Sequence, residues 1–251
     1  MEFQDKVILI TGAGAGIGAA CARAFAQKGA KVVCNSVSES ARQVAEDIHG
    51  NGGESLFAQG DISDRGDADR VLGLAVQTYG KLDVLVNNAG IVLGGTIEDT
   101  TFEDFQKTWN VNVMGTFFMS QGAVKIMKKQ GGGRIVHVSS VAGIKGHTNR
   151  LAYSASKGAV IAMTKAMALE LCHYNIQVNC VCPGTTLTPS LRERIRTSPD
   201  PELAMKQFCG RQPMGRLGEP EEIAQAVLFA ASEKAGFMTG SIISIDGGMT
   251  M

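Results

Sequence analysis

Short apolar runs rich in β-branched residues alternate with longer amphipathic stretches along the whole chain. The first run, KVILIT at 6–11, precedes a Gly/Ala-rich helical stretch, and KVVCN at 31–35 precedes ESARQVAEDIHG. Further runs are ESLFAQGD, LDVLVNNAG, GRIVHVSS, IQVNCVCPG and SIISIDGG. Continuous apolar strands separated by crossover helices indicate a parallel sheet covered on both faces. The pattern predicts an α/β fold with a doubly wound parallel sheet of about seven strands.

One irregular segment interrupts the alternation late in the chain. Residues 188–215, TPSLRERIRTSPDPELAMKQFCGRQPMG, place charges, prolines and short helical stretches between two regular units. An insertion after a late strand, at the edge where the carboxyl ends of the strands open, is more often an active-site lid than a linker. Because no linker or repeat divides the chain, we expect residues 1–251 to form a single domain with a helical substrate lid over 188–215.

Composition and charge exclude several classes of function. The 251 residues include 44% hydrophobic side chains, enough for a sizeable core, and 24 basic side chains balance 24 acidic ones. Without a run of Lys or Arg, we expect no nucleic-acid partner and no membrane-surface partner. No apolar stretch approaches the roughly 18 to 20 residues that span a bilayer, and no signal-peptide pattern is present. The expected partner is a small molecule.

The cysteines and histidines indicate reduced thiols rather than a metal centre. Six cysteines are scattered through apolar or helical contexts, and the four histidines lie at no metal-site spacing. We therefore expect no metal, buried free thiols and a cytoplasmic location.

A glycine-rich turn joins the first apolar run to the first helical stretch, in ILITGAGAGIG at 8–18. Glycines let the backbone turn tightly and let a pyrophosphate approach, and the following helix directs its N–H groups and the positive end of its dipole at that anion. Glycine spacing alone is weak evidence, but the strand–turn–helix context favours dinucleotide binding over a structural glycine turn. The expected contacts are Gly12, Gly14, Gly16, Ile17 and Gly18.

The end of the second apolar run bears on the choice of cofactor. In such folds the residue there contacts the adenosine ribose, and a carboxylate accepts hydrogen bonds from both hydroxyls of NAD. Ser36 stands where that acid would be, which removes the repulsion against a 2'-phosphate, yet no Arg or Lys follows at once to bind one. NAD and NADP both remain open, with a preference for NADP and with Asn35, Ser36 and Ser38 as neutral donors.

Asp61 and its neighbour Ile62 follow the third apolar run, in QGDIS. The carboxylate of Asp61 suits the adenine amino group of a dinucleotide. An N-cap or turn aspartate is an equally good interpretation. We include both residues among the expected cofactor contacts.

Tyr153 and Lys157 stand four residues apart in YSASK, on one face of a predicted helix. Such a pair alone is usually a surface pair. NNAG at 87–90, NVNVMG at 110–115 and VSSVAG at 138–143 accompany it. With TGxxxGxG, NNAG, a serine thirteen residues before the tyrosine and YxxxK in this order, the sequence resembles the short-chain dehydrogenase/reductase family over essentially its whole length.

The resemblance implies a Rossmann-type, NAD(P)-dependent oxidoreductase of secondary alcohols and ketones. A phenol with a pKa of about 10 is a poor base at neutral pH. The Lys157 ammonium, together with the charge of an oxidised nicotinamide, favours the phenolate of Tyr153. Ser140 would hold the substrate oxygen, and Asn112, at an expected helix kink, would anchor a water that relays the proton. The implied catalytic residues are Asn112, Ser140, Tyr153 and Lys157.

Two further segments resemble cofactor contacts of the family. The first lines the adenosine ribose and the second fixes the nicotinamide carboxamide, although Asn87 in the first also fits an amide that braces its strand. Tyr153 and Lys157 would contact the cofactor as well. The implied residues are Asn87, Ala89 and Gly90 for the ribose, and Pro183, Gly184 and Thr188 for the carboxamide.

Three arginines carry the expectation about the substrate. NRLAY, CVCPGTTLTPSLRERI and GRQPMGR resemble the branch of type 2 3-hydroxybutyrate dehydrogenases and keto-deoxy sugar-acid dehydrogenases, which bind a carboxylate at the positions of Arg150, Arg194 and Arg211. A guanidinium fork stays charged and pairs two oxygens at once. The implied substrate is a small hydroxy or keto acid or a sugar acid, which Ser140 and Tyr153 also contact. Alternatively, the lid arginines are solvated and Arg150 forms a local salt bridge.

Two rival functions and one assembly also remain open. The same chemistry would serve a neutral sugar, a cyclic ketone or a steroid, and a non-catalytic dinucleotide-binding protein would keep the fold. Such a protein is expected to lose part of the catalytic set, all of which is present. The resemblance implies a homotetramer with the helices around 101–129 and 152–174 between subunits, although their apolar faces also fit burial within one chain.

Overall fold

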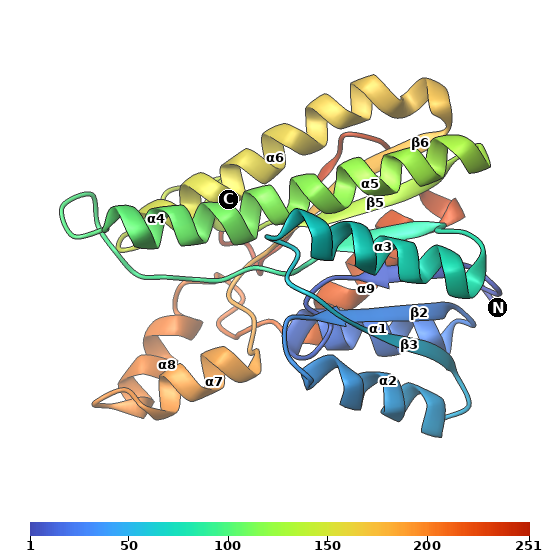
Figure 1. Ribbon diagram of the computed structural model, residues 1–251. Coiled ribbons are helices and arrows are strands. Elements are labelled where there is room, and N and C mark those ends of the chain that lie inside the picture. The colour runs from blue at the N-terminus through green and yellow to red at the C-terminus, as the bar shows by residue number, and fades with distance from the viewer.

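Seven apolar runs form parallel strands of one sheet in the computed structural model, which describes residues 1–251 (Figure 1). The strand order is β3-β2-β1-β4-β5-β6-β7, and every neighbouring pair is parallel. The doubly wound α/β sheet expected from the sequence is therefore confirmed. The strands are β1 Val7–Ile10, β2 Lys31–Ser36, β3 Glu54–Gln59, β4 Val84–Asn87, β5 Gly133–Val138, β6 Ile176–Pro183 and β7 Ile242–Ile245.

Helices cover the sheet on two sides, with α1, α2 and α9 on one face and α3, α5 and α6 on the other (Figure 1). Alternate residues of a strand point to opposite faces. Ile8 and Ile10 of β1 join a buried cluster of 27 residues, and Val7 and Leu9 join one of 19 on the other face. Burial on both faces explains the continuous apolar runs. The helices are α1 Gly16–Gln27, α2 Ser40–Gly50, α3 Arg65–Tyr79, α4 Phe102–Trp109, α5 Gly115–Gln130, α6 Leu151–Leu171, α7 Pro189–Arg196, α8 Pro201–Cys209 and α9 Pro220–Ala231.

The direction of winding reverses between β1 and β4, because the chain proceeds from β1 to β2 on one side and from β4 to β5 on the other. Ligands of such sheets bind in the crevice outside the carboxyl ends of the strands at this point. The glycine turn follows β1 and the NNAG motif follows β4. Both motifs therefore meet at the crevice.

Helices α4 and α5 form one long helix with an irregular turn in the middle. Thr101 caps its start, since its Oγ1 accepts from the N–H of Asp104 at 3.1 Å. A π-helical turn over Asn110–Met114 separates the two parts. Such turns are frequent at functional sites. The irregularity expected at Asn112 is present, and its side chain is buried.

Helices α7 and α8 lie apart from the main body, near the carboxyl edge of the sheet (Figure 1). Thr188 and Asp200 cap them, and each begins with a proline. The chain enters and leaves this unit through a narrow neck, where Thr186 pairs with Gly218 and the N–H of Leu187 donates to the carbonyl of Gly218 at 2.8 Å. Both helices fall within 188–215, and their role as a lid stays a prediction.

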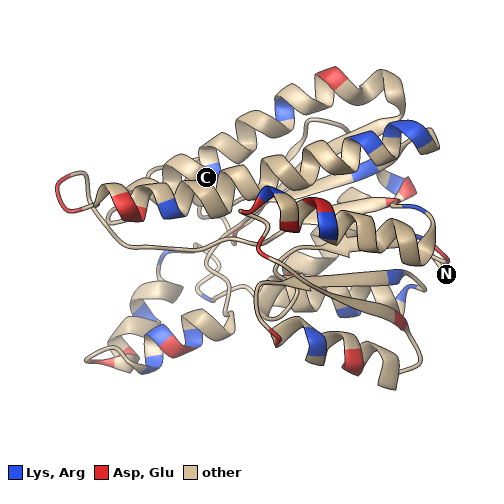
Figure 2. Ribbon diagram, viewed as in Figure 1, with Lys and Arg blue, Asp and Glu red and all other residues tan.

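Charged residues of both signs are interspersed along the outer helices (Figure 2). None of the helices combines the length and the apolar character needed to cross a membrane. Phe102 of α4, Phe117 of α5 and Leu169 of α6 are exposed apolar side chains. They lie on the helices expected between subunits, and the tetramer stays a prediction.

Candidate active site

The glycine turn between β1 and α1 is packed too closely for side chains. A Cβ on Gly18 would lie 2.1 Å from the carbonyl oxygen of Gly12, and one on Gly12 would lie 2.8 Å from the Cα of Ala89. Gly12 and Gly16 also have positive φ angles, 65° and 53°. Ala15 precedes α1 and provides no side-chain cap for its first N–H groups. The turn therefore fits the pyrophosphate of a dinucleotide.

Thr11 and Asn88 lock this turn to the NNAG motif, and neither was among the residues expected in the site. The Oγ1 of Thr11 accepts from the N–H groups of Asn88 and Ala89, both at 3.0 Å. The Nδ2 of Asn88 donates to the carbonyl oxygens of Thr11 and Gly12 at 2.9 and 3.1 Å. The partners are more than 70 residues apart in the chain, so only the fold reveals the brace.

Asn35, at the end of β2, has its amide turned into the sheet. Its Nδ2 donates to the carbonyl oxygens of Ala58 and Gly60 at 2.9 and 3.1 Å, which occupies both amide hydrogens. The structure therefore does not support Asn35 as a donor to a cofactor phosphate. Its amide braces β2 against β3 instead.

The loop from β2 to α2 places hydroxyls beside the glycine turn, and its one carboxylate, Glu39, pairs with Arg42. The Oγ of Ser36 donates to the carbonyl of Ser38 and accepts from the N–H of Ala41 at 3.2 Å. A Cβ on Gly14 would lie 2.0 Å from the Oγ of Ser40. The start of α2 therefore lies directly against the turn, where the adenosine end of a dinucleotide is expected.

Asp61 and Ile62 follow β3, and Asn87 ends β4 on the other side of β1 and β2. The Oδ1 of Asp61 accepts from the N–H and the Oγ of Ser63 at 2.9 and 2.7 Å, which is a turn contact and supports the structural interpretation. Ile62 is buried. Asn87 is also buried, and its Nδ2 donates to the Oγ of Ser120 at 2.9 Å. The bracing interpretation fits Asn87, and the contacts of all three with a cofactor stay predictions.

Helix α6 carries Lys157 one turn after Tyr153. The Nζ of Lys157 lies 5.8 Å from the centre of the Tyr153 ring and donates to the carbonyl of Val138 at 2.9 Å. Burial lowers the pKa of Lys157 to about 8. The side chain is therefore mostly protonated at neutral pH.

Tyr153 has a raised pKa in the protein alone. Burial raises the pKa above its ordinary value, while a hydrogen bond with Ser140 and the charge of Arg150 act in the opposite direction. Burial dominates, so the phenol keeps its proton at neutral pH. The lowered pKa expected from the sequence includes the charge of an oxidised nicotinamide and stays a prediction.

The two serines after β5 have different partners. The Oγ of Ser139 is buried and donates to the carbonyl of Lys157 at 2.8 Å, which ties β5 to α6. The Oγ of Ser140 accepts from the N–H of Ala142 at 3.1 Å, and the hydroxyl of Ser140 acts to lower the pKa of Tyr153. Ser140, the serine selected by its spacing from the tyrosine, is therefore the one beside the phenol.

Asn112 joins three parts of the site. Its Oδ1 accepts from the N–H of Ile91 at 2.8 Å, and its Nδ2 donates to the carbonyl of Ile91 and to the Oγ of Ser156 at 3.1 and 3.0 Å. A Cβ on Gly90 would lie 3.1 Å from the Oδ1 of Asn112 and 3.5 Å from the Nζ of Lys157. Gly90 thus permits their close approach, and the water-anchoring role of Asn112 stays a prediction.

Thr188, the N-cap of α7, lies against the glycine turn. A Cβ on Gly16 would lie 3.0 Å from its Cγ2. Pro183 ends β6, and the N–H of Gly184 donates to the carbonyl of Ile245 at 2.9 Å. These residues therefore lie at the carboxyl edge, where the nicotinamide half of a dinucleotide is expected.

Arg150, Arg194 and Arg211 gather without a carboxylate partner. Burial and the charges of Arg194 and Arg211 lower the pKa of Arg150, and burial and the charge of Arg194 lower that of Arg211. Seven other arginines form ion pairs, whereas none of these three does. The local salt bridge considered for Arg150 is therefore absent from the structure.

Phe208 and His147 complete this cluster, and Phe208 was not expected among the site residues. The guanidinium carbons of Arg194 and Arg211 lie 5.2 and 4.4 Å from the centre of the Phe208 ring. The Nε2 of His147 is buried without a partner, and burial and the charges of Lys145, Arg211 and Arg150 lower the pKa of the ring. No local spacing marks Phe208, because its role depends on how α7 and α8 pack.

Known proteins resemble the chain over its whole length. A family model described as Enoyl-(Acyl carrier protein) reductase matches residues 12–250. An uncharacterized oxidoreductase of Thermotoga maritima is 53% identical over 100% of this chain and 99% of its own length. The trans-4-hydroxycyclohexanecarboxylate dehydrogenase of Sinomonas cyclohexanicum is 39% identical over 99% of this chain and 94% of its own. The crystal structure of levodione reductase matches with a TM-score of 0.95 at 32% identity, over 99% of this chain and 98% of that chain.

The chain belongs to the short-chain dehydrogenase/reductase family. The family, the fold and the enzyme class expected from the sequence are thereby confirmed. As a short-chain dehydrogenase/reductase, the protein is an NAD(P)-dependent oxidoreductase that acts on CH–OH and carbonyl groups. Its substrate and its preference between NAD and NADP do not follow from membership.

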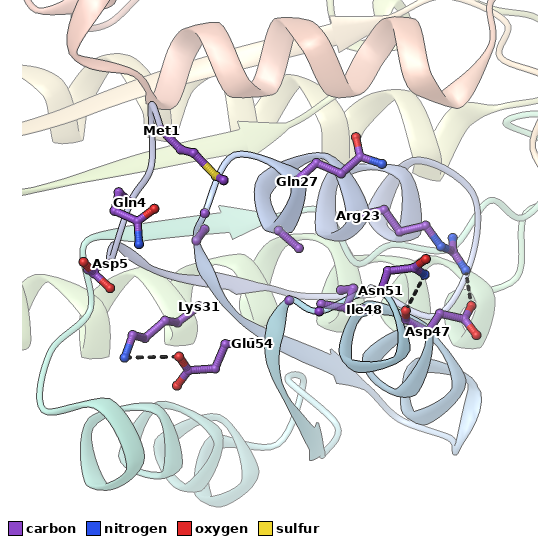
Figure 3. A pocket seen from close by; sticks show the side chains of 15 residues that line it. Met1, Gln4, Asp5, Arg23, Gln27, Lys31, Asp47, Ile48, Asn51 and Glu54 are labelled. Carbon is purple, nitrogen blue, oxygen red and sulfur yellow. Dashed lines mark hydrogen bonds and ion pairs between the residues drawn. The ribbon is translucent and has the colours of Figure 1, made fainter.

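A polar hollow of about 620 Å³ lies at the other edge of this short-chain dehydrogenase/reductase (Figure 3). Ion pairs line it, Lys31 with Glu54 at 3.2 Å and Arg23 with Asp47 at 2.8 Å. Lys31 and Glu54 begin β2 and β3. The hollow is therefore at the amino ends of the strands, far from the glycine turn, and we assign it no part in the reaction.

Proposed function

We propose that the enzyme transfers hydride between NADP(H) and the carbinol or carbonyl carbon of a small hydroxy or keto acid, sugar acids included. The group of three arginines without a carboxylate partner carries this proposal. Arg150 is half-buried, and the like charges of the exposed Arg194 and Arg211 beside it raise the free energy of the ligand-free protein, so an anion gains by binding there. A guanidinium fork pairs both oxygens of a carboxylate at once.

The position of Arg150 indicates that the acid is small. Arg150 stands three residues before Tyr153, at the start of α6, and its charge acts on the pKa of that phenol. A carboxylate paired with Arg150 would therefore lie only a few atoms from the carbon that reacts beside Tyr153. Long neutral substrates gain nothing from this arrangement.

The relatives are named for different substrates. The relative from Sinomonas cyclohexanicum is named for a carboxylate, the family model for acyl carrier protein, and the matched structure for levodione. The first favours an acid, and the last favours the rival reading of a neutral ketone. The unpaired arginines of this chain make the acid the better choice.

The loop after β2 supports NADP(H) over NAD(H). Ser36 provides no carboxylate to repel a 2'-phosphate, and the hydroxyls of Ser38 and Ser40 lie 3.1 Å apart beside the glycine turn. The first basic side chain of α2, Arg42, is paired with Glu39. Neutral donors would therefore receive the phosphate.

Side chains of the protein handle the proton in the proposed mechanism. When bound, the nicotinamide accepts hydride during oxidation and donates it during reduction. In reduction the phenol of Tyr153 gives its proton to the carbonyl oxygen, and in oxidation its phenolate takes the proton of the hydroxyl. Ser140 holds the substrate oxygen beside Tyr153. The Lys157 ammonium stabilises the phenolate, and a water at Asn112 connects Lys157 to solvent.

Kinetics of Arg150→Ala test the acid. For a small 3-hydroxy acid we expect kcat/KM to fall about a hundredfold, since a charged hydrogen-bonded pair contributes about 1.5 to 3 kcal/mol. For the corresponding neutral amide we expect a change below about threefold. The reaction is followed by the absorbance of the reduced nicotinamide.

Arg192→Ala is the control, because Arg192 lies on α7 with Arg194 but is outside the arginine cluster, is exposed and pairs with Glu219 at 3.7 Å. We expect it to change neither substrate. An equal loss on acid and amide after Arg150→Ala, or no loss on the acid, would contradict the proposed substrate.

A further inference from the structure

A chain of buried hydrogen bonds crosses the molecule beneath the catalytic residues. Asn87 of β4 donates from Nδ2 to Ser120 of α5 at 2.9 Å, and the Ser120 Oγ lies 3.3 Å from the Nε2 of His137 on β5. The His137 Nδ1 lies 2.9 Å from the Oγ1 of Thr164 on α6, which donates to the carbonyl of Val160 at 2.8 Å. His137 is fully buried.

The donors and acceptors fix the state of the His137 ring. The hydroxyl of Thr164 donates its one hydrogen to the carbonyl of Val160. Its oxygen therefore accepts from His137, so the Nδ1 of the ring carries a hydrogen. The Oγ of Ser120 accepts from Asn87 and is free to donate to Nε2. A neutral imidazole satisfies every bond of the chain. Burial, with a smaller effect of the Lys157 charge, lowers the pKa of His137 to about 4, which agrees with this state.

His137 and Ser139 attach α6 to β5 at two points. Ser139 donates to the carbonyl of Lys157, and His137 donates to Thr164. Ser139 directly follows β5 and is two residues from His137, so both side chains point to the same face of the sheet. Lys157 and Thr164 are seven apart, which is two turns along one face of α6.

Two directional contacts on one face of a helix fix more than its distance from the sheet. The other residues that α6 buries include Val160 and Ala168, and apolar contacts of this kind are not directional. The bonds that join Ser156 and Lys157 to their surroundings all lie within one turn of α6, so alone they would let the rest of the helix rotate about that turn. The bond at Thr164, two turns further along, removes this freedom, and α6 packs against the neighbouring strand β6.

We propose that His137 is a positioning residue whose Nδ1–H bond to Thr164 fixes the rotation of α6, and thereby holds Tyr153 and Lys157 in register with Ser140. This inference rests on the proposed roles of Tyr153 and Lys157. It assigns no contact of His137 with substrate or cofactor. The ring acts through the helix that carries the catalytic pair.

Two substitutions of His137 separate the role of its Nδ1 from that of its Nε2. In His137→Asn the side-chain amide nitrogen takes the place of Nδ1 and keeps the donor to Thr164, whereas in His137→Gln it reaches only the place of Nε2. We expect kcat to stay within about threefold of wild type in His137→Asn. We expect an about tenfold fall in kcat in His137→Gln, with the KM of the cofactor unchanged, because a small misplacement of reacting groups is costly.

Thr164→Val tests the same bond from the helix without touching the buried imidazole. We expect an about tenfold fall in kcat and an upward shift of about half a unit in the pKa seen in the pH profile of kcat/KM. Combined with His137→Gln, it should cause no further loss, since both remove one bond. Ser120→Ala is the control for the other end of the chain: the melting temperature falls and kcat stays within about twofold.

Three outcomes would overturn the inference. In the first, kcat falls in parallel with the melting temperature across all variants, including Ser120→Ala. In the second, kcat of His137→Asn is as low as that of His137→Gln. In the third, the losses of kcat in the double variant are additive. Failure of the proposed function is seen separately. Tyr153→Phe tests the catalytic assignment, and the ratio of acid to amide turnover tests the substrate, whereas the loss from His137→Gln should be equal on both substrates.

Discussion

The buried clusters on the two faces of the sheet contain 27 and 19 residues, whereas the cluster that joins α7 to α8 contains three, Ile195, Phe208 and Leu217. The catalytic side chains lie in the first region. Asn112 and Lys157 are nearly inaccessible, and backbone or side-chain groups bond both. Arg194 and Arg211, by contrast, lie over the ring of Phe208 and form no ion pair.

This difference indicates a division of labour between the two regions. Close packing and buried hydrogen bonds hold reacting groups to a fraction of an ångström, which proton and hydride transfer require. A small cluster on a narrow neck opens at lower free energy, as binding loops generally do. We infer that the sheet region sets the chemistry and the cofactor, and that the lid selects the substrate.

Tyr153→Phe should produce the largest loss of activity, and it changes a residue of the sheet region alone. Loss of the phenolic proton removes general acid and base catalysis, so we expect kcat to fall about 10³-fold or more for acid and neutral substrates alike. Steady-state rates in both directions measure this. The KM of the cofactor and the melting temperature should change little, and a substrate-dependent loss would argue against the division.

Substitutions that create a cavity in each region compare their contributions to stability. Leu85→Ala, in the centre of β4 where Leu85 is fully buried, should lower the free energy of unfolding by about 2 to 5 kcal/mol. Phe208→Ala should lower it by less than about 1 kcal/mol, because the lid can open without the sheet.

The same two variants should rank in the opposite order by their effect on the KM of an acid substrate. Phe208→Ala removes the ring beside two guanidiniums and should raise the KM of an acid about tenfold, while Leu85→Ala leaves that KM unchanged near neutral pH. Urea unfolding and steady-state kinetics on the same preparations provide both numbers. A Phe208→Ala variant as unstable as Leu85→Ala would show that the lid is part of the main core.

Local pattern predicted most of the sheet region. β-branched runs, the glycine turn and the spacing of Tyr153, Lys157 and Ser140 depend on residues close together in the chain. The irregular turn at Asn112 also followed from a polar residue within a helix. These features can be predicted from the sequence because the interactions that cause them act between residues a few positions apart.

Side-chain partners were beyond local pattern. The inward amide of Asn35, the brace between Thr11 and Asn88, and the bond from His137 to Thr164 join segments 23 to 77 residues apart. Phe208 reads as an ordinary apolar residue of a short helix. Which polar group meets which depends on strand order and helix rotation, and neither is written in the spacing of the residues.

Ser36→Asp, the substitution with the smallest expected effect, asks whether the sheet region alone chooses the cofactor. A carboxylate at the end of β2 repels a 2'-phosphate and accepts from the ribose hydroxyls. We expect the ratio of NADP(H) to NAD(H) affinity to fall about tenfold to a hundredfold, measured by equilibrium binding of each reduced cofactor. Ser36→Asn, of the same shape without the charge, should leave the ratio within about threefold. The preference for acid over amide should not change in either variant, because Arg150, Arg194 and Arg211 are untouched. An unchanged cofactor ratio in Ser36→Asp would show that the 2'-position of the ribose does not lie at the end of β2.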